Sequence, residues 1–141
     1  MTDNGRTPKM SDAKKIMEMI KEHDITYVDL RFTDIAGKMQ HVTQHIDTID
    51  EDALSEGFMF DGSSIAGWKA INESDMTLMP DLYRAYIDPF FAQPTLALFC
   101  DVLEPSSGEA YDRDPRGTAK AALAHIESLG IADTAFFGPE A

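Results

Sequence analysis

Cysteine is almost absent from this sequence of 141 residues, which contains only Cys100. A single cysteine cannot form a disulfide within the chain, so packing and hydrogen bonds must hold the fold. Cys100 ends the apolar run 95–100, where a small core residue is expected. The sequence therefore predicts a buried, reduced thiol in an intracellular protein, and we expect a cytoplasmic location.

Long apolar runs are also missing. No segment approaches the roughly 20 apolar residues that a helix needs to cross a bilayer. Residues 1–10 are polar and lack the apolar segment of a secretion signal. We therefore expect a soluble protein with no membrane partner.

Basic residues are scarce, because 12 Lys and Arg stand against 25 Asp and Glu and give a formal net charge of −13. Such a charge repels a phosphate backbone, which argues against nucleic acid as a partner. It is compatible with cationic ligands or divalent metals. More often an acidic surface only keeps a protein soluble, so the charge by itself assigns no function.

The 43% of hydrophobic residues is enough for a packed core. Their spacing changes between the helical period and the alternation of a half-buried strand. The predicted elements, in chain order, are a helix from Ser11 to about 22, a hairpin over 28–44, a short helix over 50–56, and strands at 76–79, 85–87 and 95–102. This mixture predicts an α+β fold.

The chain then changes character. Residues 105–108 are typical of a linker, Asp114 and Pro115 predict the start of a helix, and 134–137 predict a strand. One helix and one strand are too little for a core of their own. We therefore expect a disordered lead-in over 1–10, a first domain over 11–110, and the start of a second domain over 111–141.

The loop Phe60-Asp-Gly-Ser-Ser-Ile-Ala-Gly-Trp68 carries the strongest functional signal. Three apolar residues precede Asp61 and would anchor its backbone, and glycines at 62 and 67 permit sharp turns and close approach to a ligand. A carboxylate held this way can bind a cation or accept a proton. The plain alternative is an ordinary Asp-Gly turn.

The spacing of the residues argues against three other kinds of site. A nucleophile elbow needs glycine two residues after its serine, but Ala66 follows Ser64 at that distance. A phosphate-binding P-loop needs adjacent Gly-Lys, and Trp68 interrupts that pair. His41 and His45 have helical metal-chelating spacing, but on a strand they lie about 13 Å apart.

Seven segments together resemble glutamine synthetases of the bacterial type, and they occur in that family's order. They are Phe32-Thr-Asp34 with Gly37-Lys38, the loop 60–68, Asn72-Glu-Ser-Asp-Met76 with Leu78-Met-Pro80, Ile87-Asp-Pro-Phe90, Cys100-Asp101, Tyr111-Asp-Arg-Asp-Pro-Arg116 and Phe137-Gly-Pro-Glu140. The resemblance covers nearly all of the chain after the lead-in. It implies that the first domain is a β-grasp and that residues 111–141 begin an α/β catalytic domain.

The resemblance also implies a reaction. The family joins glutamate and ammonia with ATP, through γ-glutamyl phosphate, in glutamine biosynthesis and nitrogen metabolism. Asp61 would bind ammonium and help to remove its proton, with Ser64 nearby in the same loop. In the family this loop completes the site of a neighbouring subunit in a homo-dodecamer, so Trp68 would lie at an interface or site wall, unless it simply packs in the core.

Glu140 matches the first glutamate of the family's Gly-Pro-Glu-x-Glu metal motif, and it would ligate one of two to three Mg²⁺ or Mn²⁺ ions. The sequence ends before the second glutamate, so we expect a fragment that is inactive as a ligase by itself. The alternative is a stand-alone β-grasp interaction module that binds a partner without catalysis.

Overall fold

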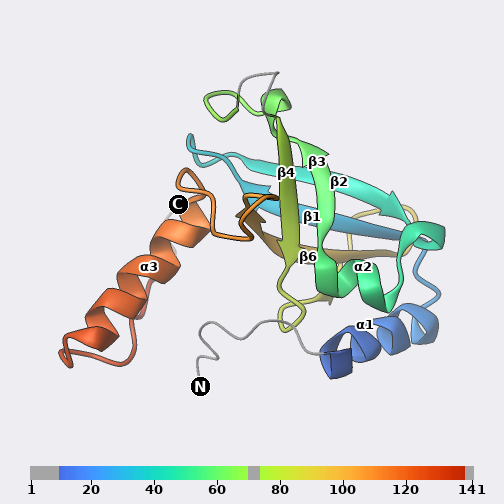
Figure 1. The fold of residues 1–141 in the computed structure, drawn as a ribbon. Coiled ribbons are helices and arrows are strands. Elements are labelled where there is room, and N and C mark those ends of the chain that lie inside the picture. Colours follow the sequence, from blue (N-terminus) through green and yellow to red (C-terminus); the bar gives the residue numbers. More distant parts are fainter. Residues whose placement is uncertain (1–9, 70–73, 139–141) are drawn as a thin grey trace.

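The computed structural model describes residues 10–69 and 74–138. Its centre is a curled sheet of six strands (Figure 1). The strands are β1 (Tyr27–Thr33), β2 (Met39–His45), β3 (Phe58–Asp61), β4 (Asp75–Pro80), β5 (Tyr86–Ile87) and β6 (Thr95–Leu103). The α+β fold and the three strands expected after residue 75 are confirmed.

The order of strands in the sheet is β2-β1-β6-β4-β3, and β5 pairs separately with β6. β6 is parallel to β1 and antiparallel to β4 and β5. Because β6 has neighbours on both edges and is covered on both faces, its residues 95–98 are all buried. This explains why the sequence there is a nearly continuous apolar run instead of an alternating one.

The predicted hairpin is present, with β1 antiparallel to β2. Val28, Leu30 and Phe32 point into the core, as their alternation predicts. The turn between the strands is held by Asp34, whose Oδ1 accepts hydrogen bonds from the backbone N–H groups of Ala36 and Lys38, both at 2.9 Å.

Helices α1 (Met10–Glu22) and α2 (Glu51–Glu56) lie close to each other beside the sheet (Figure 1). Ala13, Ile16 and Ile20 of α1 are buried in the core. Asp50 caps α2 by accepting a hydrogen bond from the N–H of Ala53 at 2.7 Å. α1 begins at Met10, one residue before the helix start expected at Ser11, and residues 1–9 lie outside the described residues.

Helix α3 (Pro115–Ser128) projects away from the sheet (Figure 1). Its start is fixed as predicted: Asp114 Oδ1 accepts from the N–H of Arg116 at 3.0 Å, and Asp114 Oδ2 accepts from the N–H of Val102 in β6 at 3.1 Å. No residue of α3 is buried, and Leu123 and Ile126 of its apolar stripe are only half-buried. The described chain therefore does not cover this helix face.

The strand predicted over 134–137 is wrong. These residues have no strand conformation, and Phe136 and Phe137 are 93% and 90% exposed. A strand exists only when a neighbour pairs with its N–H and C=O groups, and none of the described strands lies beside this segment. Within the described residues, no helix has both the length and the apolar character required to span a membrane.

Candidate active-site loop

Strand β3 delivers the predicted site residue Asp61. β3 is antiparallel to β4, with Phe60 opposite Met76 and Asp61 opposite Asp75. Phe60 packs on Phe32, with ring centroids 5.1 Å apart. Asp61 is the last residue of the strand and is exposed. The core thus holds the backbone up to the point where the carboxylate emerges.

Two glycines fix the loop that follows. Gly62 is buried, its N–H donates to the carbonyl of Ser74 at 2.7 Å, and a side chain at this position would place Cβ 2.3 Å from Met76 Sδ. Gly67 has a φ of +82°, in the left-handed region that favours glycine. The loop therefore needs glycine once for close contact with β4 and once for its turn.

Trp68 closes the loop in the core. Its side chain is 6% exposed and packs against Phe32, Phe60 and Tyr111, with ring centroids 5.5, 6.2 and 5.3 Å away. The packing role that the sequence left open for Trp68 is thus found in this chain. Its Nε1 donor is buried and has no hydrogen-bond partner among the described residues.

Ser63, two residues further along the chain, holds the Asp61 carboxylate. Its Oδ1 accepts hydrogen bonds from the Ser63 hydroxyl at 2.6 Å and from the Ser63 N–H at 2.9 Å. These two bonds, with a smaller contribution from the Ser74 hydroxyl, hold the pKa of Asp61 below its usual value. Asp61 is therefore an exposed, ionised group at neutral pH.

The two serines of the loop differ. Both lie in the short 3₁₀ helix η2 (Gly62–Ser64), but Ser64 is exposed, whereas Ser63 is half-buried and contacts Asp61. The sequence interpretation counted Ser63 among the donors of the loop but named only Ser64 as a site residue. The spacing Asp-x-Ser was the available signal, because an aspartate commonly accepts from the backbone two residues later.

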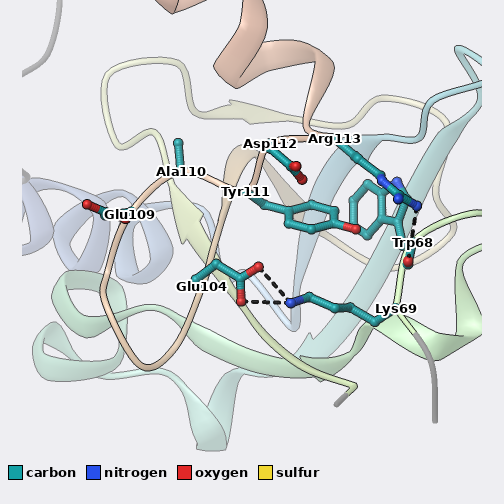
Figure 2. A pocket seen from close by; sticks show the side chains of 8 residues that line it. All are labelled: Trp68, Lys69, Glu104, Glu109, Ala110, Tyr111, Asp112 and Arg113. Atoms are coloured by element: carbon teal, nitrogen blue, oxygen red, sulfur yellow. Dashed lines mark hydrogen bonds and ion pairs between the residues drawn. The ribbon is translucent and has the colours of Figure 1, made fainter. Parts of the chain in front are cut away.

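A pocket of about 380 Å³ lies beside the end of the loop (Figure 2). Its lining residues are Trp68, Lys69, Glu104, Glu109, Ala110, Tyr111, Asp112 and Arg113. Lys69 Nζ makes two bonds to the Glu104 carboxylate, at 2.6 and 2.9 Å, and lies 5.3 Å from the Tyr111 ring centroid. Arg113 donates to the carbonyl of Gly67. Both cations thus tie the loop to residues after β6, and Asp61 is not part of this pocket.

Glu140, the predicted metal ligand, lies outside the described residues. His41 Nδ1 is 2.7 Å from Asp29 Oδ1, and the His45 ring packs edge-on against Tyr27. Among the described residues, no group of three or more His, Cys, Asp or Glu side chains could hold a metal ion. Cys100 is buried as predicted, and burial raises the pKa of its thiol.

Comparison with known families decides the relationship. The family model described as "Glutamine synthetase, beta-Grasp domain" matches residues 24–105. The chain belongs to the glutamine synthetase family. The β-grasp fold implied by the sequence resemblance is thereby confirmed.

Curated relatives agree. A glutamine synthetase of Azospirillum brasilense is 64% identical over 132 residues, which cover 94% of this chain and 28% of the relative. A 3-hydroxylaminophenol mutase of Cupriavidus pinatubonensis is 58% identical over 125 residues, 89% of this chain and 26% of the relative. The chain thus spans little more than a quarter of the length of these two relatives.

Solved structures show the same fold. The glutamine synthetase of Plasmodium falciparum superposes with a TM-score of 0.75 at 22% identity, over 92% of this chain and 24% of that chain. A structure titled "Apo GmaS without ligand" superposes with a TM-score of 0.70 at 21% identity, over 88% of this chain and 27% of that one.

Proposed function

We propose that this chain is the N-terminal part of an ATP-dependent glutamate–ammonia ligase and that it contributes the ammonium-binding Asp61. The observation that carries the proposal is an exposed, ionised carboxylate on a loop fixed by two glycines and a buried tryptophan, in a chain of this family. Glutamate, ammonium and ATP are the proposed substrates. The proposed domains are the β-grasp over 11–110 and the start of the catalytic domain over 111–141.

The proposed reaction requires a carboxylate of this kind. Ammonium is not a nucleophile until it loses a proton, and a carboxylate both attracts the cation and accepts that proton. Preorganised charge costs no rearrangement when the reaction occurs. Asp61 would bind the cation, and the exposed Ser64 hydroxyl would contact substrate from the same loop.

The rest of the site would come from elsewhere. Asp61 and Ser64 both face away from the core, so another surface must enclose any ligand they bind. We propose that a neighbouring copy in a homo-oligomer, a dodecamer in the full-length protein, supplies that surface. A cytoplasmic location fits the buried reduced thiol of Cys100.

Bound Mg²⁺ or Mn²⁺ would neutralise ATP phosphates in the complete enzyme. The described residues do not by themselves form a site for these ions. Glu140 is proposed as one ligand because its hard carboxylate oxygens suit such cations.

The first test replaces Asp61 with Asn in the full-length protein, which removes charge at nearly constant volume. We expect kcat/KM for ammonium to fall by about 10²–10⁴-fold, the usual contribution of a positioned acid–base group. Steady-state glutamine formation at varied ammonium concentration measures this. Asp47→Asn is the matched control, since Asp47 is 85% exposed and lies outside the loop.

Unchanged kcat/KM in Asp61→Asn would refute the role of Asp61. The full-length protein is also assayed for isomerisation of 3-hydroxylaminophenol, because the relative with that name shares the same region. Mutase turnover without glutamine formation would refute the ligase assignment and favour the mutase.

The isolated chain of residues 1–141 is expected to form no glutamine from glutamate, ammonium and ATP. It spans about 28% of the length of the glutamine synthetase of Azospirillum brasilense and brings only Glu140 of the proposed metal ligands. A sensitive assay for released phosphate and glutamine, with full-length protein as the positive control, measures this. ATP-dependent glutamine formation by the isolated chain would contradict the expectation.

A further inference from the structure

Ser63 makes two contacts with the functional carboxylate, and both end on the same oxygen. The hydroxyl and the N–H of Ser63 donate to Asp61 Oδ1 at 2.6 and 2.9 Å. We infer that Ser63, and not Ser64, is the positioning residue of the loop, which holds Oδ1 so that Oδ2 is presented to the cationic nitrogen donor. This inference rests on the role proposed above for Asp61.

Two donors on one oxygen restrict the carboxylate strongly. A single hydrogen bond leaves the group free to swing about that contact, whereas two donors from one residue fix both its direction and its plane. Hydrogen bonds to a charged acceptor are roughly twice as strong as those between neutral groups. Because both Ser63 donors are used on Oδ1, neither competes with a ligand for Oδ2.

The backbone that carries Ser63 is itself held in place. The N–H of Gly62 donates to the carbonyl of Ser74, the residue before β4, at 2.7 Å, and the N–H of Ile65 donates to the carbonyl of Gly62 at 3.1 Å. Ile65 is buried in the core. Ser63 thus transmits the rigidity of the sheet to an exposed carboxylate, as a preorganised site requires.

The hydrogen bond from Ser63 to Asp61 indicates which kinetic constant should change when the Ser63 hydroxyl is removed. The Ser63 hydroxyl is the largest cause of the lowered pKa of Asp61. Asp61 stays ionised at neutral pH with or without this hydrogen bond, because the ordinary pKa of an aspartate is already far below 7. Loss of the hydroxyl therefore acts through the position of the carboxylate, which should weaken ammonium capture while the proton-accepting group itself remains in place.

The test compares Ser63→Ala, Ser63→Thr and Ser64→Ala in the full-length protein. For Ser63→Ala we expect KM for ammonium to rise about tenfold, the effect of losing one hydrogen bond to a charged group, with kcat within about twofold. The low-pH limb of kcat/KM should shift to higher pH, because the pKa of Asp61 rises when the hydroxyl is removed. Ser63→Thr keeps the hydroxyl and should restore all three values.

A second readout does not depend on activity. Carbon-13 NMR titration of the Asp61 carboxyl in the full-length protein should give a higher pKa in Ser63→Ala than in the wild type and Ser63→Thr. Ser64→Ala should leave that pKa unchanged. Urea unfolding of each variant shows whether Ser63 only stabilises η2, whose N-cap is Asp61, since a purely structural role changes the unfolding midpoint but not KM for ammonium.

The outcomes distinguish a failure of the inference about Ser63 from a failure of the proposed function. If Asp61→Asn raises KM for ammonium but Ser63→Ala does not, or if only Ser64→Ala does, the inference about Ser63 is overturned and the role of Asp61 stands. If Asp61→Asn itself leaves KM and kcat for ammonium unchanged, the proposed function fails and the inference about Ser63 fails with it.

Discussion

Replacing Trp68 with Ala is expected to lower the free energy of unfolding by about 3–5 kcal/mol, the usual cost of removing a large buried aromatic side chain. Trp68 joins four parts of the chain, since it contacts Phe32 of β1, Phe60 of β3 and Tyr111 after β6, and it ends the loop that starts at Asp61. The cavity would therefore loosen both the core and the candidate site.

Trp68→Phe is the matched control. It keeps an aromatic ring in the cluster and removes the Nε1 donor that has no partner among the described residues, a group whose burial costs about 1–3 kcal/mol. We expect a clearly smaller loss than for Ala. Urea unfolding followed by circular dichroism is the measurement, because Trp68 is the only tryptophan and its fluorescence disappears with it. Equal losses for Ala and Phe would contradict the packing role.

The second large effect concerns a buried polar network on β1. Asp29 is 1% exposed. Its carboxylate accepts hydrogen bonds from Arg31 Nε at 2.7 Å and from Thr43 Oγ1 at 2.8 Å. It also lies 2.7 Å from His41 Nδ1. Arg31 in turn donates to Asp88 Oδ2 at 2.6 Å. The network links the hairpin to the segment before β6.

Asp29→Ala is expected to lower the free energy of unfolding by about 3–5 kcal/mol, because it leaves a guanidinium and a hydroxyl near the sheet without their main acceptor. Asp47→Ala is the control. Asp47 pairs with His45 at 3.3 Å but is 85% exposed, so its removal should change stability by no more than about 0.5 kcal/mol. Equal urea unfolding of both variants would contradict the importance of the network.

Stability should also depend on pH through Asp29. Burial raises the pKa of this carboxyl, but hydrogen bonds from Arg31, His41 and Thr43 outweigh burial and hold the pKa below the ordinary value of 3.8. The ionised group therefore stabilises the fold above that value, and the contribution is lost as the pH falls through the folded-state pKa.

The measurement is the free energy of unfolding between about pH 6 and pH 3 in wild type and Asp29→Asn. The wild type should lose stability faster on acidification, by up to about 1.4 kcal/mol per pH unit relative to the variant. Parallel curves would show that Asp29 does not titrate differently in the folded and unfolded states.

Local chemistry predicted most of the elements correctly. Asp50 caps α2 and Asp114 caps α3, as their positions before helical patterns indicate. The hairpin, too, has its turn where Gly37 permits a φ of +82°. These features depend on neighbours within a few residues, so the sequence alone contains what determines them.

Predictions failed where a distant partner decides the outcome. Residues 134–137 have the composition of a strand, but a strand forms only beside another strand. The apolar stripe of α3 follows the helical period, yet no described element covers it. In both cases the residue pattern was identified correctly, but the sequence did not show whether another part of the chain would contact the segment.

The sequence by itself determined the α+β class, the family resemblance and the loop that contains Asp61, because these follow from residue types and short spacings. Only the tertiary structure decided that Trp68 packs in the core and that Ser63 is the serine in contact with the carboxylate. The direction of a side chain depends on backbone angles and on residues far away in the chain. Neither can be read from the order of amino acids in a loop.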